Sequence, residues 1–379
     1  MYRKTLFLSL GIVCMAAGVV ALLGCPQVPA PEAPSGTPAP SAAPKAAPAE
    51  TPAPPPAAME RPDWSLFAQN IRLNIPVKQQ VYYFIGVSIG NPYWVDARIG
   101  FQERGNQLGV KTVFTGPVDS NVQGQATELD QVVAQKPSGI LISPADADSL
   151  KPGIDRAMDA GIPVITVDTD SPASKRLCYV GTANYESGLV VGTLMAKALG
   201  GKGKVGISNL SGQWNLEERE RGVKDALKAY PGIQYVQTVN DRADDQIAVT
   251  RNRELISANP DIAGICGLNA ASGPGIAKAV IESGKKGQIK IVCFDRNEDM
   301  LNYIADGTIE ASVAQKTHLM AALALQMLYD LNNGRIGHLP DWRKAQAPPL
   351  PASVDTGIMV ITKDNVEQFR HSEQSGGQK

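Results

Sequence analysis

The chain has 379 residues, and its 36 Lys and Arg nearly balance its 37 Asp and Glu, for a formal net charge of −1. A nearly neutral chain without a basic run lacks the electrostatic footprint of a protein that binds nucleic acid or acidic membranes. Five cysteines, an odd number, only three histidines and no Cys-x-x-Cys pair argue against a disulfide framework and a zinc site. We therefore expect no nucleic-acid partner, no metal and no cofactor.

The N-terminus has the pattern of an export signal. Arg3 and Lys4 precede the apolar run LFLSLGIVCMAAGVVALLG, which ends at Cys25. A positive start, a short apolar core and small residues before the break are typical of a cleaved signal rather than a spanning helix. LLGC, residues 22–25, matches the bacterial lipobox, so we predict a signal peptide over residues 1–24 and lipidation of Cys25. An uncleaved anchor helix is the alternative, and both interpretations place the rest of the chain outside the cytoplasm.

A low-complexity segment follows the predicted signal. Residues 25–58 consist largely of Pro and Ala, a composition that buries no core and forms an extended, semi-rigid spacer. We predict a tether that holds the folded part away from a membrane surface, either in the periplasm or on the outside of the cytoplasmic membrane. A ligand for an SH3-type domain is the alternative function for this segment.

After the short region DWSLFAQNIRLNIPV, apolar runs alternate with amphipathic segments. The predicted strands are YYFIGVSI, VKTVFTG, GILIS and IPVITVD, and the helices between them are YWVDARIGFQERGNQLG, GQATELDQVVAQ and LKPGIDRAMDAG. Continuous apolar strands separated by amphipathic helices predict a parallel sheet that is covered on both faces.

A second series of the same kind follows RLCYVGTANYESGLVVGTLMAKALGG. Its strands are KVGISN, IQYVQTV, AGICGLN and IKIVCFD, and its helices are LEERERGVKDALKAY, DDQIAVTRNRELISAN, GIAKAVIESG and EDMLNYIADG. Two such series in tandem predict an α/β fold with two Rossmann-like lobes. Because ligands of open α/β sheets bind at the carboxyl ends of the strands, we expect a ligand cleft lined by these ends.

Polar and aromatic side chains stand where the predicted strands end. They are Ser88 to Trp94, Ser143, Asp146, Asp168 and Asp170 in the first series, and Gln213, Trp214, Asn215, Arg219, Asn269, Asp295, Arg296 and Gln315 in the second. Carboxylates, amides and arginine offer bidentate partners to hydroxyl groups, and flat rings pack against C–H faces. The combination predicts a site for a neutral polyhydroxylated molecule.

Several of these residues also suit structural roles. Helix capping is an equal alternative for Asn91, Asp146 and Asp170. For Tyr93 and Trp94 the alternative is the core, but adjacent rings in the first turn of a helix cannot both face it, so we expect at least one in the cleft.

The alternative for Asn215 and Arg219 is a solvated charged face, because both residues lie in the first turns of a helix that contains EERER. Cys178, Cys266 and Cys293 lie in apolar runs and are expected to be buried. A disulfide between Cys266 and Cys293 is compatible with their neighbouring predicted strands.

The stretch GVSIG contains the Gly-x-Ser-x-Gly pattern of an esterase. Ser88, Asp295 and His318 follow the chain order of an α/β-hydrolase triad. A nucleophile elbow needs a helix directly after the serine, whereas Pro92 moves the helix start several residues later. We therefore interpret this stretch as a ligand-binding loop and predict no catalytic residue. GKGKVG, residues 201–206, precedes a strand instead of following one, so it is an ordinary turn and not a dinucleotide fingerprint.

From about Gln80 to Asn365 the chain resembles the periplasmic sugar-binding proteins of ABC importers, of the ribose- and galactose-binding type. The motifs that carry the resemblance are IGVSIGNPYW, GILISPADADSL, GIPVITVDTD, YVGTANYESG, NLEERERGVKDAL, NPDIAGICGLNAAS, IKIVCFDRNEDM, IADGTIEASVAQ and DTGIMVITKDN. They occur in the family's order and span the whole predicted folded part.

The resemblance implies a set of ligand contacts and a hinge. The implied contacts are Asn91, Tyr93, Trp94, Asp168, Asn215, Arg219, Asn269, Asp295 and Gln315. Three crossovers are implied near residues 181–184, 315–317 and 353–357. They divide the chain into an N-terminal lobe of residues 78–182 plus 316–352 and a C-terminal lobe of residues 183–315 plus 353–370.

Departures from the family pattern bear on the ligand. Thr169 stands where the ribose type carries arginine, and Ala270 stands where an acidic residue is usual, which argues against ribose itself. The calcium loop of the galactose type is not recognisable.

The predicted function is that of an extracytoplasmic lipoprotein which captures a pentose, hexose or related polyol by hinge closure and delivers it to an ABC permease in the cytoplasmic membrane. One ligand between two lobes requires only a monomer. A sensor that presents bound sugar to a receptor kinase is the main alternative, and a secreted serine hydrolase is a weaker one. A LacI-type repressor needs an N-terminal helix-turn-helix, where this chain has a signal and a tether.

Overall fold

The computed structural model describes residues 64–336 and 348–370. The predicted signal peptide, the lipidation site at Cys25 and the tether lie outside these residues. In the described ranges, none of the helices combines the length and the apolar character that crossing a membrane requires.

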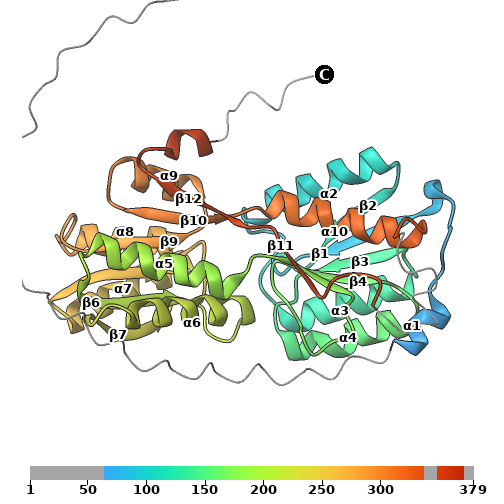
Figure 1. Ribbon diagram of the computed structural model, residues 1–379, viewed down its shortest axis with the longest axis horizontal. Coiled ribbons are helices and arrows are strands. Elements are labelled where there is room, and N and C mark those ends of the chain that lie inside the picture. Colours follow the sequence, from blue (N-terminus) through green and yellow to red (C-terminus); the bar gives the residue numbers. More distant parts are fainter. Residues whose placement is uncertain (1–63, 337–347, 371–379) are drawn as a thin grey trace, which may run out of the picture. The chain divides into compact units, whose positions relative to one another are not determined.

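Six strands form the N-terminal sheet, in the order β11-β5-β4-β3-β1-β2, and every neighbouring pair is parallel. The strands are β1 (Val81–Ile85), β2 (Lys111–Thr115), β3 (Gly139–Ile142), β4 (Val164–Val167), β5 (Cys178–Gly181) and β11 (Ser353–Asp355). Helices α2 (Trp94–Leu108) and α10 (Thr317–Asn332) lie on one side of the sheet, and α3 (Val122–Ala134) and α4 (Ala147–Asp159) lie on the other (Figure 1). The short helices α1 (Ser65–Asn70) and η1 (Val77–Gln79) precede β1. Together these elements form the N-terminal lobe.

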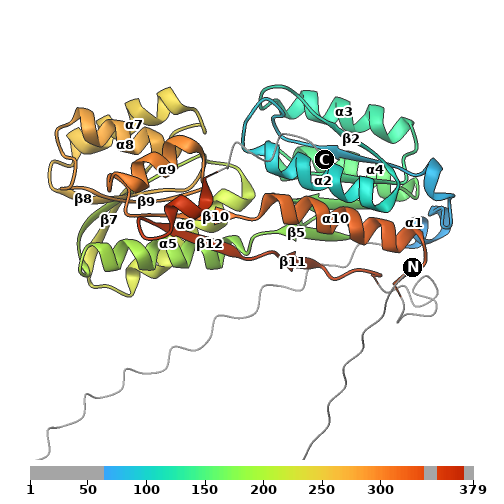
Figure 2. The ribbon, with the colours of Figure 1, turned by 90° about the horizontal axis from the view of Figure 1, so that it is seen from above.

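The C-terminal sheet has the order β12-β10-β9-β8-β6-β7, and its pairs are parallel except for antiparallel β10 and β12. The strands are β6 (Lys202–Asn209), β7 (Gly232–Asn240), β8 (Ile262–Gly267), β9 (Lys290–Phe294), β10 (Ala311–Gln315) and β12 (Ile358–Thr362). The helices are α5 (Asn184–Ala198), α6 (Trp214–Lys228), α7 (Asp245–Ala258), α8 (Ser272–Glu282), α9 (Glu298–Ala305) and η2 (Val366–Phe369). Figure 2 shows α5 on one side of this sheet and α7 and α8 on the other. These elements form the C-terminal lobe.

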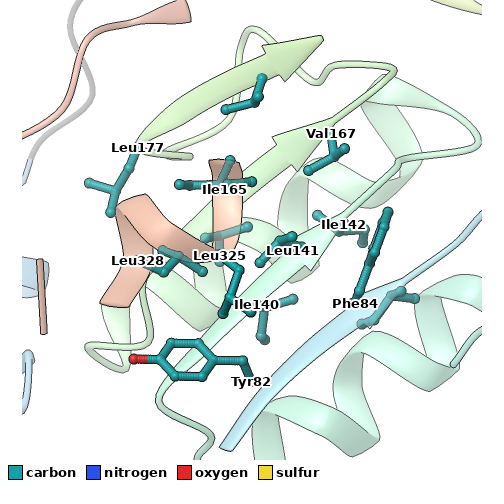
Figure 3. Close-up of a cluster of buried hydrophobic side chains, with 14 of the residues drawn as sticks. Tyr82, Phe84, Ile140, Leu141, Ile142, Ile165, Val167, Leu177, Leu325 and Leu328 are labelled. Atoms are coloured by element: carbon teal, nitrogen blue, oxygen red, sulfur yellow. The ribbon is translucent and has the colours of Figure 1, made fainter. Parts of the chain in front are cut away.

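The buried strands explain why the apolar runs in the sequence are continuous. All four residues of β3 and all four of β4 are buried, because helices cover both faces of the sheet. In the core shown in Figure 3, Leu141 of β3 lies near Leu325 and Leu328 of α10. The prediction of two parallel α/β sheets covered by helices is confirmed.

The chain passes from one sheet to the other at three places. It crosses between β5 and α5, between β10 and α10, and between β11 and β12. Residues 353–355, expected in the C-terminal lobe, instead form β11 and pair with β5 of the N-terminal sheet. The third crossover therefore lies between Asp355 and Ile358, where Gly357 takes a φ of 72° that few other residues adopt.

Cys266 and Cys293 are free and lie on opposite faces of the C-terminal sheet. Val292, not Cys293, is the register partner of Cys266, and successive residues of a strand point to opposite faces. Cys266 packs in the cluster with α5 and α6, whereas Cys293 contacts Met300 of α9 at 3.0 Å between the two sulfurs. A disulfide between these cysteines is incompatible with this register.

Candidate ligand-binding site

Two buried carboxylates occupy equivalent positions in the two lobes. Asp168 follows β4 and Asp295 follows β9, and each of these strands is third in the order of its sheet. Both residues have left-handed backbone conformations, with φ of 70° and 74°, which are uncommon for residues other than glycine. The backbone N–H of each donates to the neighbouring strand, Asp168 to Val180 O at 3.1 Å and Asp295 to Val313 O at 2.9 Å. The same local geometry thus places one carboxylate at the end of each sheet.

Tyr93 and Gln315 connect these carboxylates. The Tyr93 hydroxyl donates to Oδ1 of Asp168 and accepts a hydrogen bond from Nε2 of Gln315 at 2.9 Å. Gln315 Nε2 also lies 3.4 Å from Asp295 Oδ1, and Gln315 Oε1 accepts from the Thr182 hydroxyl at 2.9 Å. One network therefore joins residues of the N-terminal lobe to the end of β10 in the C-terminal lobe.

Arg219 of α6 is buried, with 1% of its surface exposed. Its Nε donates to Asn184 Oδ1 at 2.9 Å and its Nη1 to Leu268 O at 3.0 Å, while the guanidinium carbon lies 4.3 Å from the centre of the Phe294 ring. Burial of a guanidinium requires such partners because an unpaired buried charge is very costly. The solvated-face alternative for Arg219 is therefore wrong.

Close packing of α5 against α6 allows Arg219 to take this buried position. A Cβ atom at Gly188 of α5 would lie 2.1 Å from Arg219 O, and one at Gly222 of α6 would lie 2.1 Å from Tyr185 O. Two glycines thus let the helix backbones approach far enough for Asn184, at the start of α5, to reach Arg219.

Four of the buried polar atoms without a hydrogen-bond partner among the described residues lie near the strand ends. They are Arg219 Nη2, Asn215 Oδ1, Ser143 Oγ and, at the end of β6, Asn209 Oδ1. Ser143 follows β3 directly, and Asn215 is in the first turn of α6. Buried polar groups are nearly always paired in native proteins, so unpaired ones at one end of the sheets point to ligand hydroxyls. Ser143 stood at a predicted strand end, but its position alone did not separate it from a structural serine.

The electrostatics follow from burial. Burial raises the pKa of the Asp168 carboxyl to about 6, against the opposing effects of the Tyr93 hydrogen bond and the positive charge of Arg219. Burial likewise raises the pKa of the Asp295 carboxyl, and the positive charge of Arg219 is the largest of the effects that lower it. The pKa of Tyr93 lies well above its usual value because its hydroxyl is buried beside Asp168, so Tyr93 stays a donor at neutral pH. Two carboxylates with one guanidinium form a site that is rich in acceptors.

Three residues of the predicted set lie elsewhere or are already engaged. Trp94 is a core residue, 5% exposed, with its ring 6.0 Å from that of Phe84. Asn91 is exposed, and its Oδ1 accepts from the Tyr93 N–H at 2.9 Å, so it shapes the turn before α2. Asn269 is buried, but its amide is occupied at both ends. Its Nδ2 donates to Asp241 at 2.9 Å, and its Oδ1 accepts from two backbone N–H groups.

Two strand-end aspartates have structural roles. Asp146 is the N-cap of α4, and its side chain accepts from Ser149 N at 2.7 Å. Asp170 is buried and forms an ion pair with Arg176 at 2.5 Å while accepting from the Thr166 hydroxyl at 2.6 Å. In the described ranges, no group of three or more His, Cys, Asp or Glu side chains is arranged to hold a metal ion.

Residues 82–336 match the model of the family described as periplasmic binding protein domain. The chain belongs to the periplasmic binding protein family. The resemblance inferred from the sequence motifs is confirmed at this level, and the two sheets are those of the family's type I fold.

Among periplasmic binding proteins, similar chains are known from several bacteria. The ribose import binding protein RbsB of Bacillus subtilis is 26% identical over 257 residues, which cover 67% of this chain and 83% of that protein. A sugar ABC transporter sugar-binding protein from Bacillus halodurans is 33% identical, with a TM-score of 0.71, over 77% of this chain and 100% of the other. The structure described as an XylFII–LytSN complex is 29% identical, with a TM-score of 0.67, over 76% of this chain and 99% of the other.

The residues of the hydrolase alternative each bond to other groups in this periplasmic binding protein. The Ser88 hydroxyl donates to Val118 O at 2.9 Å. His318 is paired with Glu103 on the surface, 3.0 Å apart, and Asp295 faces Gln315. The geometry of these three residues is not that of a triad, in which the histidine contacts both the serine and the acid.

Two further contacts join the lobes outside the buried network. Arg296, directly after Asp295, forms an ion pair with Asp96 of α2, and both side chains are 25% exposed. The ring of Tyr179 in β5 lies edge-on to that of Trp214 at the start of α6, with 5.6 Å between the ring centres. The N-terminal ends of α2 and α6 thus contribute contacts that hold the two lobes together.

Proposed function

We propose that this protein is an extracytoplasmic sugar-binding protein that captures a monosaccharide or related polyol and delivers it to an ABC permease. The observation that carries the proposal is the joint burial of Asp168, Asp295 and Arg219, drawn from both lobes, beside unpartnered polar atoms. A neutral ligand with many hydroxyls suits this set, because each hydroxyl can donate to a carboxylate and accept from the guanidinium or an amide.

Each group has a distinct task in this proposal. Asp168 and Asp295 accept hydrogen bonds from ligand hydroxyls, and Arg219 donates through Nη2. Asn215 Oδ1 and Ser143 Oγ supply neutral partners, and the Tyr93 ring offers a flat apolar face. The predicted contributions of Trp94 and Asn91 are indirect, because the first fixes the position of the Tyr93 ring and the second shapes its turn. Asn269 acts in the same indirect way, by ordering the loop before α8.

Ligand capture uses the three crossovers as a hinge. A ligand that bonds to both Asp168 and Asp295 favours the arrangement in which the lobes approach, because only that arrangement gives it both sets of contacts. Asp96 with Arg296, and Tyr93 with Gln315, stabilise the same arrangement from the protein side. No bond is made or broken in this function, and the protein has no catalytic residue.

The family and the N-terminal sequence support the proposed partners. The lipid at Cys25 anchors the protein, the tether gives it reach, and a monomer suffices for one ligand. Sensing is a second candidate function, supported by the relative described as an XylFII–LytSN complex. In that case the partner is a receptor kinase instead of a permease, while the ligand site is the same.

Calorimetric titration with pentoses, hexoses, polyols and inositols tests the proposal. We expect a ligand with a Kd near 1 μM, about 8 kcal/mol of binding free energy. The same ligand at a hundred times its Kd should stabilise the folded state by about 2.7 kcal/mol. Asp295→Asn should weaken binding about 10- to 100-fold and reduce the stabilisation accordingly, and the control Asp261→Asn, at an exposed ion pair with Lys204, should change neither. If none of these compounds produces a heat of binding, the proposal of a sugar ligand is contradicted.

A further inference from the structure

The Tyr93 hydroxyl bonds to two of the candidate ligand-binding residues. It donates to Asp168 and accepts from Gln315 Nε2 at 2.9 Å, so it acts as donor and acceptor at once, as a sugar hydroxyl can. Both ends of the Gln315 amide are engaged, because its Oε1 also accepts from the Thr182 hydroxyl at 2.9 Å. A phenylalanine would give the same ring without these bonds.

The position of the Tyr93 ring is fixed by its surroundings. Its backbone N–H donates to Asn91 Oδ1 at 2.9 Å, and the residue lies directly before α2 in a helical backbone conformation. Its ring packs edge-on against Trp94, with 5.1 Å between ring centres, and Trp94 in turn packs against Phe84 in the core. The hydroxyl therefore cannot leave Asp168 and Gln315 without moving a ring that the core holds in place.

The polar groups left for a ligand lie on the other sides of the site. Arg219 Nη2, Asn215 Oδ1 and Ser143 Oγ have no hydrogen-bond partner among the described residues, and the Tyr93 hydroxyl bonds to Oδ1 of Asp168, not to its other carboxylate oxygen. These groups are free to bind ligand hydroxyls. A hexose has one more hydroxymethyl group, whose oxygen needs a partner of its own when it is buried.

We propose that the Tyr93 hydroxyl takes the place of a ligand hydroxyl between Asp168 and Gln315 and thereby restricts the site to five-carbon sugars and polyols. This inference rests on the proposed sugar-binding function and adds the size class of the ligand. A hexose that enters the site must either displace the Tyr93 hydroxyl or bury its own without a partner.

Homologous sugar pairs test the inference directly. D-xylose and D-glucose, L-arabinose and D-galactose, and D-ribose and D-allose each share their ring configuration and differ by one hydroxymethyl group. Dissociation constants for all six are measured by calorimetry with the unaltered protein, with Tyr93→Phe and with the control Tyr83→Phe. Tyr83 lies on β1 and donates to Gln135 at the surface, at 2.6 Å, so its substitution removes a tyrosine hydroxyl away from the site.

In the unaltered protein, the pentose of the best-bound pair should bind at least about tenfold more tightly than its hexose. Tyr93→Phe should reduce that ratio about tenfold, chiefly by improving hexose binding, whereas Tyr83→Phe should leave it unchanged. Tyr93→Phe removes one oxygen and keeps the ring packing, and its thermal melt checks that it folds.

Two results overturn the inference while leaving the proposed function in place. One is an unaltered protein that prefers the hexose, and the other is a Tyr93→Phe variant in which both members of a pair lose the same factor of affinity. If the unaltered protein binds no member of the full panel of pentoses, hexoses, polyols and inositols, the proposed function itself is refuted, and the inference with it.

Discussion

Asp168→Asn should make the protein more stable and less able to bind its ligand. Asparagine has the shape of aspartate, tolerates the left-handed conformation at this position, and can still accept the Tyr93 hydrogen bond through Oδ1. It differs from aspartate in carrying no charge to bury. The substitution therefore measures, with almost no change in side-chain shape, how much unfolding free energy the protein loses by burying the Asp168 charge.

The magnitude follows from the pKa of Asp168, which burial raises from 3.8 to about 6 in the folded protein. A group whose pKa is raised on folding stabilises the folded state at low pH, and this stabilisation is lost as the pH rises through the folded value. As the pH rises from well below 3.8 to 7.5, the folded protein therefore loses about 3 kcal/mol relative to a chain with an uncharged residue at this position, because one pKa unit corresponds to 1.36 kcal/mol.

Urea unfolding of both proteins from pH 4 to pH 8 measures the difference. We expect Asp168→Asn to exceed the unaltered protein by about 3 kcal/mol at pH 7.5 and by less than about 1 kcal/mol at pH 4. Ligand affinity should fall about 10- to 100-fold, the loss of one charge-assisted hydrogen bond. The control Asp261→Asn alters a carboxylate in an exposed ion pair, so its unfolding free energy should show no comparable gain at pH 7.5.

Two outcomes would refute this reasoning. A variant that is less stable than the unaltered protein at pH 7.5 would mean that the Asp168 charge is favourably compensated in the folded state. A stability difference that does not change with pH would mean that the carboxylate does not titrate in this range, and that the gain has another origin.

Three further substitutions separate packing, lobe contact and ligand contact. Gly188→Val should lower the unfolding free energy by about 3 kcal/mol in urea, since its Cβ would meet Arg219 O at 2.1 Å; an unaffected protein would show that α5 and α6 separate freely. Asp96→Asn should weaken ligand binding by about 0.2–1 kcal/mol in low salt and by less in 0.5 M salt, because its ion pair with Arg296 is partly exposed; a salt-independent loss would contradict this. Trp94→Phe should lower stability by about 1–2 kcal/mol but change ligand affinity less than threefold, and a large affinity loss would place its ring against the ligand.

The site could be predicted from the sequence wherever a residue's place followed from strand order alone. Asp168, Asp295 and Gln315 each end a recognisable apolar strand, and parallel strands bring their carboxyl ends to one edge. Asn91, Trp94 and Asn269 met the same criterion. In the structure, however, Asn91 bonds within the turn before α2, Trp94 packs against Phe84 in the core, and Asn269 bonds to Asp241. Only side-chain packing, which strand order does not give, separates these residues from those that face the ligand site.

Sequence periodicity by itself determined the class of this protein. Continuous apolar strands alternating with amphipathic helices, repeated twice, leave little choice other than two helix-covered parallel sheets, because such strands can only be buried on both faces. The ordered family motifs indicated the same fold and the same group of proteins.

Only the tertiary structure decided which polar groups meet. The network of Tyr93, Asp168 and Gln315 joins residues more than two hundred positions apart in the chain. The burial of Arg219 depends on two glycines that let α5 and α6 approach. Neither is encoded in a local pattern, because hydrogen bonds and close helix contacts depend on the relative placement of distant segments, and periodicity records only which face of each segment is buried.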